Sequence, residues 1–242
     1  MKIGLVPAAG EGKRIGGVFK ELLPFDSRKG IDNPRRVIDA SLDQLEDGGV
    51  DVTYVITSPK KASSHMGYLG SKHGNMKIAY LCQEAPTGLS RAVDLIGSYI
   101  ETGDMICFAM PDTVFWPHGA ILELLREQNI TDADLVLGLH KVKDPSPFGM
   151  VRMNNGHITQ VIDKPRLAKN EWIWSCAVFK PSLLGLITYN SSKELSDIFD
   201  IAVQTPQFDI SNVMFGTHKY LDMGSYDNYV KALKYATSHR RR

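Results

Sequence analysis

The chain has 242 residues, and its 28 Lys and Arg residues nearly balance its 27 Asp and Glu residues, giving a formal net charge of +1 at pH 7. This balance argues against a broad basic surface for nucleic acid or an anionic membrane, and 43% hydrophobic residues suffice for a full core. There is no apolar stretch of eighteen residues and no signal peptide, so we predict a cytoplasmic protein without a membrane partner. Three widely spaced cysteines (Cys82, Cys107 and Cys176) and seven histidines without metal-binding spacing are interpreted as structural.

A short apolar strand and a glycine-rich, basic loop open the chain. The run Ile3–Val6 predicts a buried strand. Four glycines without β-carbons follow it, at Gly10, Gly12, Gly16 and Gly17. Three cations of the kind that a polyphosphate needs accompany them, at Lys13, Arg14 and Lys20. The segment is therefore predicted to bind phosphate groups.

The spacing of this loop differs from two common phosphate-binding motifs. A dinucleotide fingerprint, G-x-G-x-x-G, needs a third glycine where this chain has Ile15. A P-loop needs a glycine where this chain has Pro7, and a Ser or Thr where it has Arg14. The loop therefore belongs to neither class.

Strand-like and helix-like segments alternate through the first 140 residues, which predicts a parallel sheet with helices on both faces. The further predicted strands are Val52–Thr57, Lys77–Cys82, Met105–Met110 and Asp134–Leu139. The predicted helices are Val37–Glu46, Leu89–Tyr99 and Gly119–Gln128.

Segments after His140 are shorter, and Asn154-Asn155-Gly156 predicts a hairpin turn, so a smaller antiparallel layer is expected there. The chain closes with a predicted strand, Lys219–Asp222, and an amphipathic helix, Tyr226–Thr237. No repeat or low-complexity linker interrupts it. We predict one domain over residues 1–242, with a nucleotide-binding half (1–140) and a substrate-binding half (141–242).

Polar residues follow the predicted strands at the edge where open α/β sheets bind ligands. Gln83 can hydrogen-bond a base edge, and Gly88 opens a helix where a backbone can meet the base. Asp112 comes after the next strand, and its carboxylate suits Mg²⁺, which needs only one or two protein carboxylates besides phosphate oxygens. Read alone, Asp112 also fits a helix N-cap.

These motifs, in this order from Ile3 to Tyr229, resemble those of the sugar-1-phosphate nucleotidyltransferases (nucleoside-diphosphate-sugar pyrophosphorylases), such as glucose-1-phosphate thymidylyltransferase and uridylyltransferase. The family's G-x-G-x-R loop, K-x-x-x-P segment and Q-x-x-P-x-G run are matched at Arg14, at Lys20 with Pro24, and at Gln83, Pro86 and Gly88. The resemblance implies a Rossmann-like, GT-A-like α/β fold, a mostly parallel sheet flanked by helices with a smaller antiparallel substrate layer. It also implies self-association, which is common in the family.

The resemblance assigns roles to individual residues. Transfer of the nucleotidyl group would depend on Arg14, Lys20, Asp112 and Lys164. Mg²⁺ would be held by Asp112 and Asp222. The nucleotide would contact Ala8, Ala9, Gly10, Gly12, Gln83 and Gly88. The sugar phosphate would contact Gly149, Asp163, Lys164 and Cys176, near an acidic patch of Glu194 and Asp197.

Three positions depart from the family pattern. Pro111 replaces a glycine before the metal aspartate, Asp163 replaces a glutamate, and Cys176 replaces a glycine against which the sugar ring lies. The sugar pocket is therefore expected to be altered.

The implied reaction joins a nucleoside triphosphate, with dTTP or UTP favoured, to a sugar 1-phosphate by in-line attack on the α-phosphorus, with Mg²⁺ as cofactor and pyrophosphate as leaving group. Two alternatives stay open: a cytidylyltransferase acting on a small polyol phosphate, and a non-catalytic subunit that binds a nucleotide or sugar phosphate. The PAAG start fits uridylyl- and cytidylyltransferases, so neither the base nor the sugar is fixed.

Overall fold

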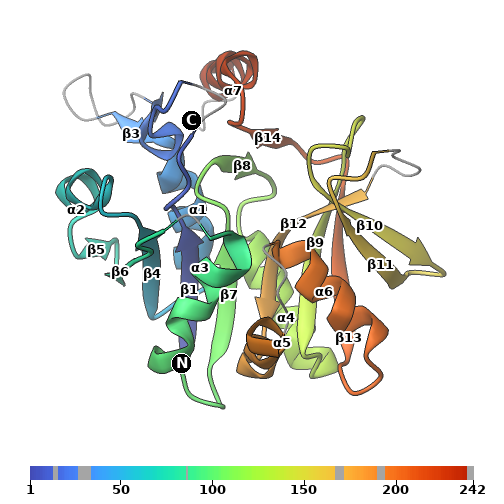
Figure 1. Ribbon diagram of the computed structural model, residues 1–242. Coiled ribbons are helices and arrows are strands. Elements are labelled where there is room, and N and C mark those ends of the chain that lie inside the picture. The colour runs from blue at the N-terminus through green and yellow to red at the C-terminus, as the bar shows by residue number, and fades with distance from the viewer. Residues whose placement is uncertain (13–15, 27–33, 86, 167–171, 190–193, 239–242) are drawn as a thin grey trace.

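The computed structural model describes residues 1–12, 16–26, 34–85, 87–166, 172–189 and 194–238. Among them a ten-stranded sheet runs through the molecule with helices on both faces (Figure 1). Its central strands are parallel: β1 (Lys2–Pro7) lies between β4 (Val52–Thr57) and β7 (Met105–Ala109), and β6 (Met76–Cys82) pairs with β4. The predicted α/β class is confirmed.

The second part of the sheet is antiparallel and is built around β12 (Trp172–Phe179). One edge of β12 pairs with β9 (Leu135–Lys141). Its other edge pairs first with β10 (Gly149–Asn154) and then with β7. The strand predicted at Asp134–Leu139 thus exists as β9, but it does not continue the parallel run, because β12 lies between it and β7.

The predicted hairpin joins β10 to β11 (His157–Asp163). Asn155 (φ 49°) and Gly156 (φ 83°) both have left-handed backbone conformations, as a two-residue hairpin turn requires. The hairpin brings Gly149 opposite Asp163 at its open end. The expected antiparallel layer is therefore confirmed.

The remaining elements complete these layers. The described helices and 3₁₀ segments are η2 (Lys20–Leu22), α1 (Val37–Asp47), α2 (Ala62–Leu69), α3 (Leu89–Asp94), η3 (Leu95–Tyr99), α4 (Ala120–Thr131), η4 (Pro181–Leu183), α5 (Leu184–Tyr189), α6 (Leu195–Gln204) and α7 (Tyr226–Ser238). The other strands are β2 (Pro24–Asp26), β3 (Arg35–Arg36), β5 (Lys72–His73), β8 (Thr113–Phe115), β13 (Ile210–Gly216) and β14 (Tyr220–Asp222). The helix predicted at Leu89–Tyr99 is divided into α3 and η3.

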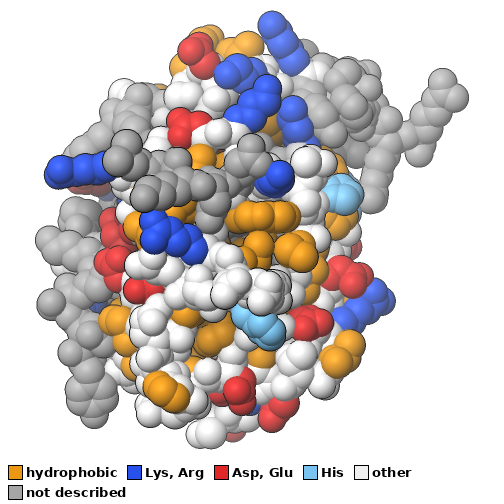
Figure 2. Space-filling view, turned by 90° about the vertical axis from the view of Figure 1, so that its right-hand side faces the viewer, with side chains coloured by type: hydrophobic (Ala, Val, Ile, Leu, Met, Phe, Trp, Pro, Cys, Tyr) orange, Lys and Arg blue, Asp and Glu red, His pale blue; other side chains and the backbone are white. Residues whose placement is uncertain are grey.

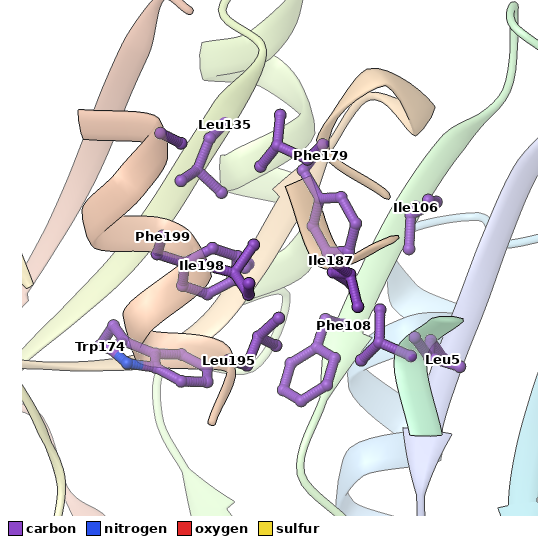
Figure 3. Close-up of a cluster of buried hydrophobic side chains, with 14 of the residues drawn as sticks. Leu5, Ile106, Phe108, Leu135, Trp174, Phe179, Ile187, Leu195, Ile198 and Phe199 are labelled. Carbon is purple, nitrogen blue, oxygen red and sulfur yellow. The ribbon is translucent and has the colours of Figure 1, made fainter. Parts of the chain in front are cut away.

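Hydrophobic side chains fill both faces of the sheet. On one face α5 and α6 pack on the sheet, and Phe108, Phe179 and Phe199 lie in the cluster shown in Figure 3. On the other face α1 and α4 cover a second cluster. Strands buried on both sides explain why the sequence shows continuous apolar runs at β1 and β7.

The charge balance of the sequence is visible on the surface. Figure 2 shows acidic and basic side chains interspersed with hydrophobic ones on one face of the molecule, with Lys and Arg gathered toward its upper part. Among the residues that the structure describes, no helix combines the length and the apolar character needed to cross a bilayer.

Candidate active site

Two adjoining hollows lie beyond the carboxyl ends of the central strands. The first has a volume of about 240 Å³ and the second about 190 Å³. The first is lined by Pro7, Ala8, Ala9, Gly10, Lys20, Glu21, Lys61, Gln83, Gly88, Leu89, Ala92, Met110, Pro111 and Asp112. The second is lined by Lys20, Leu89, Met110, Asp112, Thr113, Pro147, Phe148, Gly149, Asp163, Lys164, Trp174, Ser175, Glu194, Leu195, Ser196, Tyr220 and Asp222.

Lys20 and Asp112 line both hollows, as do Leu89 and Met110, so the two hollows adjoin in one cleft. Most of the residues selected from the sequence line this cleft, although they come from separate strands and loops. Only the sheet topology could bring them together. Arg14 is outside the described residues, and its predicted role stays a prediction.

The loop after β1 supplies backbone to the first hollow. Gly12 has φ +62°, and a β-carbon there would come within 2.4 Å of the carbonyl oxygen of Val18. The N–H of Gly17 donates to the carbonyl of Gly12 at 3.1 Å. Gly12 is therefore needed for the loop conformation itself, whereas Ala8, Ala9 and Gly10 line the hollow.

Gln83 lies at the end of β6 with a fixed amide orientation. Its side-chain nitrogen donates to the carbonyl oxygen of Gly88 and to Oγ1 of Thr87, both at 3.2 Å. Because a backbone carbonyl can only accept, the nitrogen must be the atom that faces Gly88. The carbonyl oxygen of Gln83 is then the acceptor that the side chain can offer to a ligand.

An ion pair occupies the junction of the two hollows. The ammonium of Lys20 binds Oδ2 of Asp112, whose side chain is only 5% exposed. Among the described residues, the other oxygen, Oδ1, is buried without a hydrogen-bond partner. A buried carboxylate oxygen left in this way is unusual, because such atoms are normally satisfied.

Asp222 reaches the same place through a small separate sheet. Its strand β14 pairs with β8, so that Asp222 lies opposite Thr113, and the N–H of Met223 donates to the carbonyl of Asp112 at 2.9 Å. The strand that precedes Asp112 is β7, and β14 does not pair with it; β14 pairs instead with β8, the short strand that follows Asp112.

Tyr220 shares strand β14 with Asp222 and also lines the second hollow. Burial raises the pKa of the Tyr220 hydroxyl well above its usual value, and the charges of Asp222 and Asp112 raise it further. The tyrosine therefore keeps its proton and stays a hydrogen-bond donor beside the two carboxylates.

A chain of hydrogen bonds organises the far end of the second hollow. The indole N–H of Trp174 donates to Ser196 at 3.0 Å, and Ser196 donates to Oδ1 of Asp163 at 3.2 Å. Oδ2 of Asp163 accepts from Nζ of Lys164 at 2.9 Å, and Glu194 lies 3.4 Å from the same ammonium. The lysine is thereby held at the mouth of the hollow.

Lys164 has a left-handed backbone conformation, φ 40°, which is uncommon for a residue with a β-carbon. Burial lowers the pKa of its ammonium, but the hydrogen bond to Asp163 and the charge of Glu194 outweigh burial, so the net pKa is raised. Lys164 therefore remains a cation at neutral pH.

Cys176 lines neither hollow. A bulge at Ser175 shifts the register between Trp174 and Cys176, so Ser175 faces the second hollow and Cys176 faces the opposite core. Cys176 is fully buried, and burial raises its thiol pKa to about 12. The expectation that the Cys176 side chain contacts the substrate is corrected: its chain neighbour Ser175 lines the second hollow instead.

Sequence reasoning did not select several of the polar lining residues, among them Glu21, Lys61, Ser175, Ser196 and Tyr220. Tyr220 had a detectable signal, because it lies two residues before Asp222 on the same predicted strand and so shares its face. Lys61 had none, since a lysine in a polar loop is normally solvent-exposed.

No group of three or more His, Cys, Asp and Glu side chains suited to a metal ion occurs within the described part of the chain. Asp112 and Asp222 are only two carboxylates and so do not form a group of this size. A metal site whose remaining ligands are phosphate oxygens of the substrate would need only these two protein carboxylates.

Solved structures of similar fold cover nearly the whole chain. A Bacillus anthracis protein assigned provisionally as a glucose-1-phosphate thymidylyltransferase, solved with sucrose, has a TM-score of 0.88 at 18% identity, over 100% of this chain and 98% of that one. A UDP-glucose pyrophosphorylase complexed with UDP-glucose has a TM-score of 0.83 at 18% identity, over 99% of this chain and 100% of that one. A UDP-glucose pyrophosphorylase from Acinetobacter baumanii has a TM-score of 0.81 at 17% identity, over 100% and 95%. These likenesses define the fold class.

The family is shown by the sequence itself. The nucleotidyl transferase family model matches residues 3–239, and the chain therefore belongs to this family. No curated protein sequence matches it significantly. The resemblance drawn from the motifs is confirmed at the level of the family.

Proposed function

We propose that the protein is a sugar-1-phosphate nucleotidyltransferase, which joins UTP or dTTP to a sugar 1-phosphate and releases pyrophosphate. The observation that carries the proposal is the continuous cleft, whose two hollows meet at Lys20 and Asp112. A nucleotide in the first hollow and a sugar phosphate in the second would bring their phosphates to this junction.

The first hollow supports a uracil or thymine base. With its nitrogen committed to Gly88, Gln83 offers an oxygen that accepts a hydrogen bond. Uracil and thymine carry a donor at N3, whereas N3 of cytosine is an acceptor and would face that oxygen unfavourably. The same geometry disfavours the alternative of a cytidylyltransferase.

The reaction needs charge neutralisation and alignment more than a protein nucleophile. A phosphate oxygen of the sugar 1-phosphate would attack the α-phosphorus, and the bond from that phosphorus to the bridging oxygen would break, releasing pyrophosphate. Lys20 would leave Asp112 and bind the triphosphate. Lys164, fixed by Asp163, would orient the attacking phosphate.

Asp112 and Asp222 would hold Mg²⁺. The buried, unpartnered Oδ1 of Asp112 fits this role, and two hard carboxylates are a donor set that Mg²⁺ accepts. When bound, the ion would neutralise part of the phosphate charge. Tyr220, which stays protonated, would donate a hydrogen bond close to these carboxylates.

The proposal is tested by pyrophosphate release in the presence of Mg²⁺, with UTP, dTTP, CTP, GTP and ATP each paired with glucose 1-phosphate, with other sugar 1-phosphates and with a small polyol phosphate. We expect turnover with UTP or dTTP, and a loss of about a hundredfold or more in Asp112→Asn, which keeps the shape and removes the charge. Asp47→Asn, at an exposed aspartate of α1, is the matched control and should leave turnover unchanged.

Turnover with CTP and a polyol phosphate alone would replace the proposal with the cytidylyltransferase reading. Tight nucleotide binding without turnover over the whole panel would instead support a binding subunit.

A further inference from the structure

A buried ion pair lies beneath the backbone of the first hollow. Nζ of Lys61 is 2.7 Å from Oε1 of Glu21 and donates to the carbonyl oxygen of Ala8 at 3.1 Å. Lys61 is 2% exposed and Glu21 is 1% exposed. The contact joins three segments that are far apart in sequence: the end of β1, the segment η2, and the start of α2.

The network extends away from the cleft through His65. Its Nε2 lies 2.9 Å from Oε1 of Glu21, and its Nδ1 lies 2.7 Å from Oγ1 of Thr57 at the end of β4. His65 and Thr57 are both buried. One carboxylate oxygen of Glu21 is therefore held from two sides, by Lys61 and by His65, and η2 has a fixed position relative to the sheet.

Glu21 is ionised in this setting. Burial raises the pKa of its carboxyl, but the hydrogen bond with His65 and the charge of Lys61 outweigh burial and lower it. A buried ion pair contributes little net stability compared with apolar residues of the same shape, because both charges lose their hydration. What such a pair does supply is a defined geometry.

That geometry acts on groups that line the cleft. Glu21 directly follows Lys20, so fixing Glu21 fixes the backbone from which the Lys20 side chain reaches Asp112. A cation bound to the Ala8 carbonyl also polarises the amide between Ala8 and Ala9, which makes the N–H of Ala9 a stronger donor. Both effects favour binding of an anionic ligand in the first hollow.

We propose that Lys61 and Glu21 are positioning residues for the nucleotide, which hold the segment Ala8–Gly10 and Lys20 in the arrangement that receives the phosphates. This inference rests on the proposed function of the cleft. It adds two residues that act through the backbone and through Lys20, without a requirement that either side chain touches the reacting atoms.

The experiment separates positioning from stability with two variants. In Lys61→Met the stem is kept and the buried Glu21 loses the ammonium that balances its charge, so the melting temperature should fall. In the double variant Lys61→Met, Glu21→Gln the uncompensated charge of Glu21 is removed. Most of the decrease in melting temperature should therefore be reversed. The Kd of Mg-UTP and of Mg-dTTP, measured by calorimetry, should be raised about tenfold or more in both variants.

Lys180→Met is the matched control. Lys180 likewise donates to a backbone carbonyl, that of Asp132, and pairs with a carboxylate, that of Asp134. These contacts lie at the end of β9 that is away from the cleft. The loss of Lys180 should change nucleotide affinity by less than about twofold, because it contacts no part of the cleft.

The outcomes distinguish the inference from the proposed function. If the double variant regains both its melting temperature and the wild-type Kd, the ion pair is only structural and the inference fails while the proposed function stands. If the wild-type protein binds neither nucleotide, both fail. A raised Kd in a double variant of restored stability supports the positioning role, and that result does not depend on whether the single variant folds.

Discussion

At the scale of single residues, the pairing of Lys20 with Asp112 sets a competition at the centre of the cleft. The ammonium binds Oδ2 of the same carboxylate that is proposed to hold Mg²⁺ through Oδ1, so a cation arriving without nucleotide meets a carboxylate whose charge Lys20 already balances. A triphosphate offers Lys20 another anionic partner. Metal and nucleotide should therefore favour each other's binding.

Replacing Lys20 with Met should raise the affinity for Mn²⁺, measured by electron paramagnetic resonance without nucleotide, by about tenfold. The reason is that the competing cation is gone while Asp112 keeps its charge. Lys60→Met, at an exposed lysine, serves as the control. Unchanged or weaker Mn²⁺ binding in Lys20→Met would show that the ion pair does not compete with a metal.

His140 is a second residue whose environment makes a measurable prediction. It is fully buried beneath the second hollow, where it bonds Ser175 at 2.8 Å and the carbonyl of Trp116 at 2.6 Å. Burial lowers its pKa to about 4 from 6.5. The folded protein thus binds this proton less readily than the unfolded chain, and stability present above pH 6.5 is lost as the pH falls toward 4.

The loss amounts to about 3 kcal/mol from this group. It is measured as the difference in the pH dependence of the unfolding free energy between wild type and His140→Gln. The variant should show a flatter slope between pH 6.5 and 4, whereas His157→Gln, at an exposed histidine, should retain the wild-type slope. Parallel slopes in wild type and His140→Gln would refute the buried neutral state of His140.

At the scale of elements, the sequence predicted local structure well and pairing poorly. The strand Val52–Thr57 was predicted with its observed bounds, and the Asn155-Gly156 turn was predicted from its chemistry alone. The antiparallel insertion of β12 beside β9 was missed, because periodicity reports burial and not the identity of a neighbouring strand. The same limit hid the bulge at Ser175, which changes the face of Cys176.

The residues of the candidate active site could be predicted where they come directly after a strand in the sequence. Gln83 and Asp112 were found in this way, because the carboxyl ends of parallel strands share one edge. Lys61 could not be predicted, since its contact with Glu21 depends on the packing of α2 against η2, which no local pattern encodes.

The contact between β10 and β12 depends on the absence of a side chain at Gly149. A β-carbon there would come within 2.0 Å of Nε1 of Trp174 and 2.6 Å of Oγ of Ser196. Gly149→Ala should therefore displace the indole, break its bond to Ser196, and destabilise the protein by about 1–3 kcal/mol. The KM for the sugar phosphate should rise, since Ser196 also holds Asp163.

The measurement combines urea unfolding with tryptophan fluorescence and steady-state kinetics. Gly97→Ala is the matched control, because a β-carbon at Gly97 meets no atom within 4 Å and its φ is not in the left-handed region. If Gly149→Ala unfolds like wild type, the close packing of β10 on Trp174 is not a constraint on the protein.

At the scale of the whole molecule, the two halves predicted from the sequence are interlocked. Strand β9 belongs to the first half, yet its partners β12 and β13 both belong to the second. In the other direction, β14 of the second half pairs with β8 of the first, which is how Asp222 comes beside Asp112. The site is thus built from both halves of the chain.

We therefore expect the chain to unfold as one cooperative unit, in a single calorimetric transition whose calorimetric and van't Hoff enthalpies agree. A fragment of residues 1–140 should not fold alone, because its copy of β9 would expose a fully buried apolar run, Leu135–Leu139, with no strand on either side. Circular dichroism of that fragment, alone and mixed with residues 141–242, checks this directly. Two separate transitions in the full chain, or a folded 1–140 fragment, would mean that the nucleotide half is a domain of its own and that β12 docks onto a preformed sheet.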